Sequence, residues 1–321
     1  MLRRTALLGP GALLLAHAGQ AAAPDTWPNK SIRFIVNNGP GGAADLMARI
    51  IAQQLGEALQ QPVVVENKPG TSVGMVYAAR QPADGYTIAM GSFSQVFGAP
   101  LLSKVPYDIF RDFEPVAMVA TAPVVMVVTP ASPYQSFEAV IAAARARPGA
   151  LNYGSGGLGT VAHLLSESLN AAAGIRMQNV PYKSGIDSLN GLLASNLDVA
   201  IVDPQPALPH IRAGKLHALA VSGPERFSQL PAVPTLGELG LPQLTALNPW
   251  AIYMPAGVPA PVVARFREAL DGVMEGPALK QRFADWGVDA RHSSSAELRA
   301  FMVAETTRYQ KVIQERNIRV D

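Results

Sequence analysis

The stretch NNGPGGAAD at residues 37–45 connects an apolar extended segment, residues 32–36, to an amphipathic helix. A second glycine-rich stretch, NYGSGGLGTVAH at 152–163, also lies between an extended segment and a helix. Each turn presents unpaired backbone N–H groups and the positive end of a helix to whatever lies in front of it. Because the turns lie more than a hundred residues apart, they predict two lobes that face each other across a cleft and share one small acidic ligand.

Strands and helices alternate along the chain in the order that builds parallel sheets. After the first strand, the hydrophobic pattern predicts strands at residues 62–66, 86–90, 124–130, 198–202 and 216–221, and one that ends at 180–182. It predicts a helix at 137–146 and a C-terminal helix whose apolar positions recur at spacings of three and four. The fold class is therefore α/β, with the apolar residues 248–259 returning across the lobes.

Polar side chains follow several of these strands. Ser92 follows the third strand at the carboxyl edge of the sheet, where open α/β sheets bind ligands. Tyr182 and Lys183 end another strand, and Lys183 is either solvated or functional. Asp203 ends the strand at 198–202, where it either contacts the ligand, directly or through water, or caps a turn. We expect Ser92, Tyr182 and Asp203 to be ligand-binding residues.

The composition excludes several classes of function. The chain has 321 residues, a formal net charge of +2 and only 16% charged residues, so it lacks the basic field that binds nucleic acid. It has no cysteine, which excludes disulfides, thiolate catalysis and cysteine zinc sites. Its histidines have no metal-ligand spacing. The expected partner is a small molecule, with no metal and no cofactor.

The N-terminus has the pattern of an export signal. Arg3 and Arg4 precede an apolar run at residues 6–16, and small residues suit cleavage after Ala18 or Ala23. The apolar run is shorter than the roughly 20 residues that span a bilayer, which disfavours a membrane anchor. We expect a periplasmic protein whose signal peptide is cleaved.

Several motifs together resemble a known family. They are PGGAAD (40–45), VVVENKPG (63–70), ADGYT (83–87), PYD (106–108) with DFEPV (112–116), LNYGSGG (151–157), VPYKSG (180–185), ALPHIRAGKLHALAV (207–221) and MPAGVP (254–259). In this order they resemble the Bug proteins, the extracytoplasmic solute-binding proteins of tripartite tricarboxylate transporters. The resemblance implies a periplasmic-binding-protein fold of type II, with two α/β lobes joined by two crossings.

The resemblance also implies a function and a division of the chain. Residues 1–23 would be the signal peptide, 24–123 and 248–321 one lobe, and 124–247 the other. A monomeric receptor of this kind closes on a small carboxylate, which is a di- or tricarboxylate or an aromatic acid. It presents that solute to a membrane permease of the tripartite tricarboxylate type or to a sensor.

In the family, backbone groups of the two glycine-rich turns and ordered water hold the ligand carboxylate. Carried over to this sequence, the first turn supplies Gly41, Gly42, Ala43 and Ala44, with Asp45 in the first turn of the helix. The second turn supplies Ser155, Gly156, Gly157, Gly159 and Thr160. Glycine lets the backbone approach an anion closely and tolerates positive φ. Asp45 could instead only complement the helix N-terminus.

The first turn departs from the family pattern. Members commonly place an aromatic residue between prolines before Pro-Gly-Gly, whereas Asn37, Asn38 and Gly39 precede Pro40 in this chain. If the Asn38 amide faces the cleft, it favours a ligand with a polar substituent. Alternatively, Asn38 satisfies the loop backbone, as Asn often does in turns.

An enzyme is the alternative to a receptor. Residues 154–159 match the dinucleotide pattern GxGxxG, but no acidic residue ends the next strand to hold a ribose. A secreted hydrolase acting on a carboxylated substrate could use Ser155, His163 and Asp203. However, Tyr153 occupies the first glycine position of a nucleophile elbow. His163 would also lie eight residues after Ser155, which leaves a catalytic geometry unsupported. His163 is predicted on the polar face of its helix, either on the surface or supporting the residues that contact the ligand, so we expect a receptor and not an enzyme.

Overall fold

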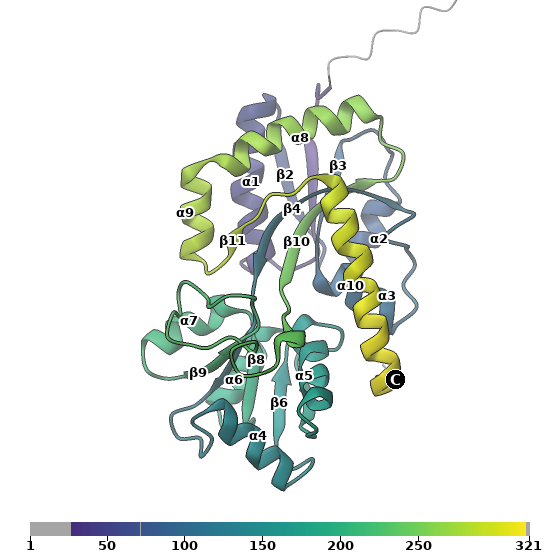
Figure 1. Ribbon diagram of the computed structural model, residues 1–321. Helices are drawn as coiled ribbons and strands as arrows, with labels where there is room; N and C mark the ends of the chain where they lie inside the picture. Colours follow the sequence, from purple (N-terminus) through teal and green to yellow (C-terminus); the bar gives the residue numbers. More distant parts are fainter. Residues whose placement is uncertain (1–26, 71, 319–321) are drawn as a thin grey trace, which may run out of the picture.

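The computed structural model describes residues 27–70 and 72–318 and shows two α/β lobes, one above the other (Figure 1). The export signal expected at residues 1–23 lies outside the described residues. We call the part built on the six-stranded sheet the first lobe and the part built on the five-stranded sheet the second lobe.

The sheet of the first lobe has the strand order β11-β4-β10-β3-β1-β2. Its strands are β1 (Ile32–Val36), β2 (Val63–Asn67), β3 (Thr87–Ser92), β4 (Phe113–Ala122), β10 (Asn248–Pro255) and β11 (Asp289–Ala290). β1 runs parallel to β2 and β3, whereas β10 runs antiparallel to β3 and β4. The carboxyl ends of β1 and β3 therefore share one edge of the sheet.

Helices cover both faces of this sheet because successive side chains of a strand point to opposite faces. Phe34 and Val36 of β1 pack in one cluster with residues of α1 (Ala43–Leu59), α8 (Ala260–Glu275) and α9 (Pro277–Asp285). Ile35 packs in another cluster with residues of α2 (Val73–Ala79), the π-helix η1 (Ser94–Gly98) and α10 (Ser295–Arg316). A short helix, α3 (Ala99–Leu102), follows η1.

The sheet of the second lobe has the order β7-β6-β8-β5-β9. Its strands are β5 (Val125–Val128), β6 (Asn152–Ser155), β7 (Gln178–Pro181), β8 (Val199–Val202) and β9 (His217–Val221). Its helices are α4 (Phe137–Ala146), α5 (Val161–Ala172), α6 (Gly185–Leu193), α7 (Pro204–Arg212) and the 3-10 helix η2 (Pro242–Leu244). β6 runs parallel to β7 and β8, so their carboxyl ends also share an edge.

The chain crosses between the lobes twice, after β4 and before β10, and Ser222 holds the two crossings together. The Ser222 hydroxyl accepts a hydrogen bond from the Val124 N–H at 2.9 Å and donates one to the Ala246 carbonyl at 2.6 Å. The Ser222 backbone bonds both residues as well, at 3.0 and 2.9 Å. This buried serine therefore ties the first crossing to the second.

Several predicted elements are confirmed. The first strand spans residues 32–36 and the fourth helix spans 137–146. The second strand begins at Val63, one residue later than predicted, although the Pro62 carbonyl already accepts the Ile32 N–H. The sequence did not predict α7, because it contains prolines at 204, 206 and 209, and proline is unfavourable inside a helix. It also did not predict α8, α9 or the long strand β4.

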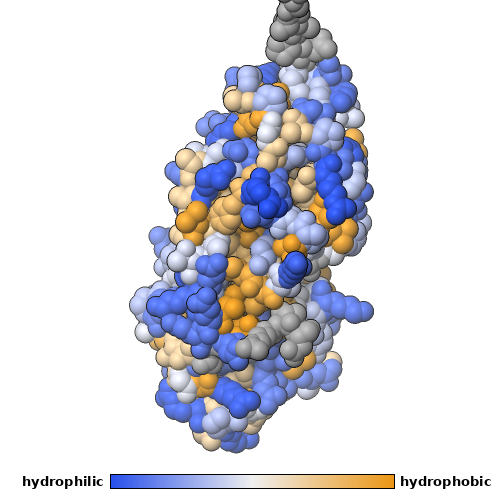
Figure 2. All heavy atoms as spheres, turned by 90° about the vertical axis from the view of Figure 1, so that its right-hand side faces the viewer, coloured by the Kyte–Doolittle hydropathy of each residue, from blue (hydrophilic) through white to orange (hydrophobic). Residues whose placement is uncertain are grey.

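The face that carries α10 has an apolar groove of about 390 Å³ between α5 and α10. Figure 2 shows the apolar surface gathered at the middle of this face. Leu165, Ala172, Leu244 and Val312 are among the residues that line the groove. Within residues 27–70 and 72–318, the helices are too short or too polar to cross a membrane.

Candidate ligand-binding site

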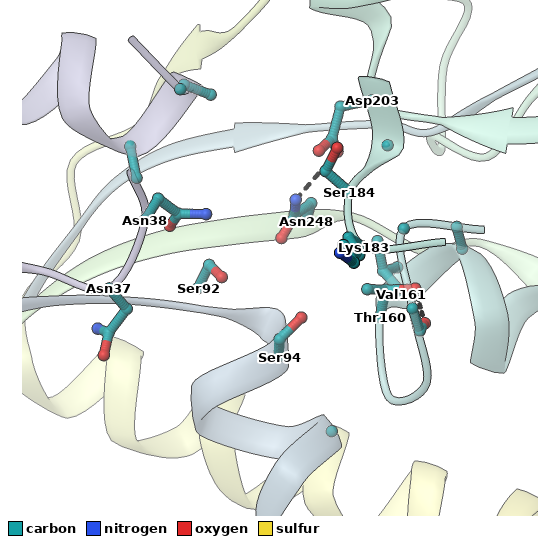
Figure 3. Close-up of a pocket in the computed structure, with 18 of the residues that line it drawn as sticks. Asn37, Asn38, Ser92, Ser94, Thr160, Val161, Lys183, Ser184, Asp203 and Asn248 are labelled. Atoms are coloured by element: carbon teal, nitrogen blue, oxygen red, sulfur yellow. Dashed lines mark hydrogen bonds between the residues drawn. The ribbon is translucent and has the colours of Figure 1, made fainter. Parts of the chain in front are cut away.

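A cleft of about 840 Å³ is lined by residues of both lobes. The first lobe contributes the turn after β1, the first turn of α1 and the carboxyl end of β3 with η1. The second lobe contributes the turn after β6, the segment after β7, and the first turns of α5, α6 and α7. Figure 3 shows Asn38 and Ser92 on one side of this space and Thr160 and Lys183 on the other.

The first turn of α1 presents free backbone donors to the cleft. The N-cap residue is Gly42, which has no side chain to cap the helix. The first N–H groups of a helix have no acceptor within the helix. The N–H groups of Ala43 and Ala44, both of which line the cleft, are therefore available to a ligand.

The first turn of α5 has a similar arrangement on the opposite wall. The Thr160 hydroxyl caps this helix by accepting the His163 N–H at 3.3 Å, and it donates to the Gly157 carbonyl at 2.9 Å. This cap leaves the N–H groups of Val161 and Ala162, which line the cleft, without an acceptor in the helix.

Two further helices also begin at the cleft. Ser184 caps α6 by accepting the Asp187 N–H at 3.1 Å, and Gly185 and Ile186 line the cleft behind it. Asp203 occupies the N-cap position of α7. Four helices thus direct the positive ends of their dipoles at one space. The sequence predicted α6 from its apolar residues Leu189, Leu192 and Leu193, but it predicted only the first turns of α1 and α5 as ligand sites. Ser184 and Asp187 have the spacing of a helix start.

Few side-chain charges accompany these dipoles. Among the described residues that line the cleft, Lys183 and Asp203 carry the formal charges. The remaining polar groups are amides and hydroxyls, including those of Asn38, Ser94 and Gln205. The arrangement can hold an anion mainly through backbone N–H groups and helix dipoles, without a cluster of basic side chains.

Most of the predicted binding residues line the cleft. They are Asn38, Gly42, Ala43, Ala44, Ser92, Gly156, Gly157, Thr160, Tyr182 and Asp203. The structure places Gly41, Asp45, Ser155 and Gly159 outside this lining. These four residues belong to the two turns but do not line the cleft. Their hydrogen bonds and backbone angles, described below, stabilise the turns.

The Asp45 carboxylate accepts its hydrogen bonds from other groups of the protein. It accepts hydrogen bonds from the Gly41 N–H at 2.9 Å, from Arg49 Nε at 3.0 Å and from Asn67 Nδ2 at 2.9 Å. Burial by itself would raise the pKa of Asp45, but the bonds from Arg49, Gly41 and Asn67 outweigh burial and lower it. Asp45 therefore shapes the first turn, and no oxygen of it lacks a donor.

Glycines that require positive φ lie beside the ligand space as well as in it. Gly41 has φ 83°, Gly157 has φ 115° and Gly159 has φ 75°. Gly42, in contrast, has φ −75°, which any residue can adopt. A Cβ at 157 would also lie 3.2 Å from the Tyr182 carbonyl oxygen, so a larger residue there is strained. Positive φ thus explains Gly157 but not Gly42.

The prediction that His163 lies on the polar face of α5 was wrong. It is not on the polar surface of α5 but buried, with 4% of its area exposed. His163 Nδ1 accepts the Gly159 N–H at 3.2 Å. Burial lowers the pKa of His163, and the nearby Glu167 carboxylate only partly opposes this. His163 therefore holds the second turn as a neutral ring.

The side chains of the alternative hydrolase are bonded to other groups. The Ser155 hydroxyl donates to Asn179 Oδ1 at 3.1 Å, and the His163 ring bonds the Gly159 backbone. Asp203 Oδ1 accepts a hydrogen bond from Asn248 Nδ2 at 3.0 Å. In the described part of the chain, no hydrogen bond joins any two of Ser155, His163 and Asp203.

The two asparagines of the first turn have different roles. Asn37 is buried, donates to the Met90 carbonyl at 2.9 Å and accepts the Met75 N–H at 3.0 Å. It therefore joins β1 to β3 and α2. The Asn38 side chain is exposed and points into the cleft in Figure 3, as one of the two predicted alternatives requires.

Sequence analysis missed Asn248 and Gln95. Asn248 begins β10 and lies at the cleft, where it bonds Asp203 of the other lobe. Gln95 accepts hydrogen bonds from the Ser92 N–H at 3.0 Å and the Ser92 hydroxyl at 2.6 Å, which fixes Ser92. A polar residue at the start of an apolar strand was the only signal for Asn248. In the described ranges, no group of three or more His, Cys, Asp or Glu residues is placed to hold a metal ion.

Comparison with known proteins identifies the family. The model of the tripartite tricarboxylate transporter family receptor matches residues 47–318. The chain belongs to this receptor family. The receptor is 35% identical to protein BugT of Bordetella pertussis, and the match covers 97% of each chain.

Solved structures agree with this assignment. A protein from R. palustris solved with adipate is 29% identical to the receptor, with a TM-score of 0.83 over 91% of this chain and 99% of the other. The periplasmic binding protein BugD is 25% identical, with a TM-score of 0.81 over 91% and 99%. MatC from Rhodopseudomonas palustris, with bound malate, is 25% identical, with a TM-score of 0.80 over 89% and 100%. The receptor therefore has a periplasmic-binding-protein fold.

Proposed function

We propose that the receptor captures a small carboxylate between its lobes and presents it to a membrane permease of the tripartite tricarboxylate type or to a sensor. One observation carries this proposal: α1, α5, α6 and α7 begin at one cleft, which has Lys183 as its cation among the described lining residues. Such a space favours an anion over a neutral ligand. The similar structures with adipate and malate support the same ligand class.

Backbone donors can account for useful affinity. A hydrogen bond to a charged group contributes about 1.5–3 kcal/mol. Three or four such bonds from the first turns of α1 and α5 would contribute about 4.5–12 kcal/mol, and the cost of immobilising the ligand offsets part of this gain. No catalytic step is proposed, so the solute leaves the cleft chemically unchanged.

The proposal includes the place of the protein and its parts. We propose a periplasmic monomer, exported with residues 1–23 as a cleaved signal. We propose residues 24–123 and 248–321 as one closing unit and residues 124–247 as the other. This division is supported by the sheets, because the strands of the six-stranded sheet lie before residue 123 or after residue 247 and those of the five-stranded sheet lie between them. A hydrolase is not favoured, because Ser155, His163 and Asp203 bond other groups.

Thermal unfolding of the purified mature protein tests the proposal. Mono-, di- and tricarboxylates are compared with their amides and methyl esters. A true ligand at 100 times its dissociation constant stabilises the protein by about 2.7 kcal/mol. The amides and esters are expected to give almost no shift in Tm. Equal shifts from an acid and its amide would contradict the proposal, and native mass spectrometry after incubation checks that the acid is unchanged.

A further inference from the structure

Asp203 is in a position to cap α7 but makes no cap. It follows β8 directly and occupies the N-cap position, yet its side chain accepts no hydrogen bond from the helix. An N-cap side chain bonds the N–H of the second or third helical residue. α7 begins with Pro204, Gln205 and Pro206, so the third position has no N–H. The sequence therefore removes one of the two donors that a capping Asp203 would use.

Asp203 has one hydrogen-bond partner in the described part of the chain. Asn248 Nδ2 donates to its Oδ1 at 3.0 Å, and Oδ2 has no donor. No Lys, Arg or His of the described residues forms an ion pair with it, and burial raises its pKa against the effect of the Asn248 bond. Asn248 is itself nine-tenths buried at the start of β10, so it holds the carboxylate in one orientation.

The acceptors at this position outnumber the donors. The Asn248 Oδ1 atom is buried and has no partner in the described residues, and Asp203 Oδ2 also has none. Figure 3 shows both side chains on the wall of the cleft. For the buried Asn248 Oδ1 atom, the lack of a partner costs about 1–3 kcal/mol, whereas Asp203 is only half-buried. A ligand that brings a donor to this position removes that cost, whereas a plain carboxylate does not.

We propose that Asp203, oriented by Asn248, selects carboxylates that also carry a hydrogen-bond donor, a hydroxyl or an ammonium group, on their carbon chain. The inference rests on the proposed function, since the helix N-termini hold the carboxylate and Asp203 binds the second group. Asp203 is thus a specificity-determining residue of the cleft. It accounts for an acidic side chain in a site whose other features attract anions.

Matched acids test this inference. Succinate, malate and aspartate share one chain and differ in having hydrogen, hydroxyl or ammonium at one carbon, and glutarate, 2-hydroxyglutarate and glutamate form a longer set. Calorimetric titration of the wild-type protein is expected to give at least about tenfold tighter binding for a donor-bearing member than for the plain acid of its set. Asp203→Asn is expected to reduce this preference to less than about threefold, without weakening the plain acid.

Asp285→Asn is the matched control, because it removes the same charge from an exposed position on α9 and is expected to keep the preference. Circular dichroism checks that each variant is folded. Equal or better binding of the plain acids by the wild-type protein would overturn the inference even if no variant folds. An unchanged preference in folded Asp203→Asn would also overturn it while leaving carboxylate capture intact. Failure of every acid to bind would overturn the proposed function as well.

Discussion

Gly42 lines the cleft at a position where the backbone does not require glycine. Its φ of −75° suits any residue, and a Cβ there would lie no closer than 3.6 Å to its neighbours. The space in front of it is the cleft itself. The backbone of α1 therefore does not require glycine at 42, and we expect the missing side chain to leave room for the proposed anion.

Gly42→Val is expected to remain folded and to lose carboxylate binding by more than about tenfold, because the branched side chain blocks the N–H groups of α1. Loss of a favourable N-cap costs about 0.5–2 kcal/mol, so Tm falls by a few degrees. Calorimetry measures the affinity. Gly272→Val on α8, where a Cβ also meets open space, is the control. Wild-type affinity in Gly42→Val would contradict the assignment of this turn to the ligand.

His163 makes the stability of the second turn depend on pH. Burial lowers its pKa in the folded protein below the ordinary value of 6.5. As the pH falls through 6.5, the unfolded chain takes up the proton first, so the stability due to neutral His163 is complete above this pH and is lost below it. The free energy of unfolding of the wild type relative to His163→Gln is therefore expected to fall between pH 7.5 and pH 5.5.

Urea unfolding at several pH values measures this difference, and comparison with the variant removes the contribution of the other titrating groups. Gln retains an acceptor for the Gly159 N–H but does not ionise. A difference that stays constant over the range would mean that His163 is protonated equally in both states.

At the scale of elements, η1 and the turn before α5 meet without side chains between them. A Cβ at Gly98 would overlap the carbonyl oxygen of Gly159, and a Cβ at Gly159 would lie 3.1 Å from the Gly98 carbonyl carbon. Gly98 belongs to the first lobe and Gly159 to the second. The lobes thus touch, backbone against backbone, at this edge of the cleft.

Gly98→Ala is expected to hold the lobes apart. Overpacking of this kind costs about 1–3 kcal/mol, which lowers ligand affinity roughly tenfold to a hundredfold if binding requires the contact. Small-angle scattering with saturating ligand should show a larger radius of gyration than the wild type has. Gly272→Ala provides the control, since nothing lies near its Cβ. A variant as compact and as tightly binding as the wild type would mean that closure does not use this contact.

The sequence predicts the elements that depend on local chemistry. The first turns of α1 and α5 were found because glycine-rich turns between a strand and a helix have a recognisable pattern. The first turn of α7 was missed because Pro204, Pro206 and Pro209 argue against a helix, although two of them occupy its first turn, where few N–H groups are needed. The burial of His163 was missed because it depends on the tertiary packing around α5, which the pattern of that helix alone does not record.

At the scale of the whole molecule, the family motifs and the alternating pattern together predicted two lobes and two crossings. They could not predict how the crossings are held or which side chains meet between lobes. The Asp203–Asn248 bond joins residues 45 positions apart, and no local pattern records such a pair. Residues that act through the tertiary structure are therefore the ones that sequence reasoning missed.

Substitution of Ser222 tests how the two crossings are held together. Ser222→Ala leaves the buried Val124 N–H without its side-chain acceptor and removes a donor from Ala246. The free energy of unfolding is expected to fall by about 1–3 kcal/mol. Guanidinium unfolding measures the change, with the exposed Ser228→Ala as control. Equal stability of the two variants would mean that the backbone bonds of Ser222 alone hold the crossings.

The helix N-termini around the cleft have one more consequence. Peptide N–H groups do not ionise in the ordinary pH range, so α1 and α6 present the same donors to an acid at every pH at which the acid itself stays ionised. A receptor that gripped its solute with histidines could unload by changing charge. Release of the proposed carboxylate is therefore expected to depend on separation of the two lobes and not on a change of charge in the protein.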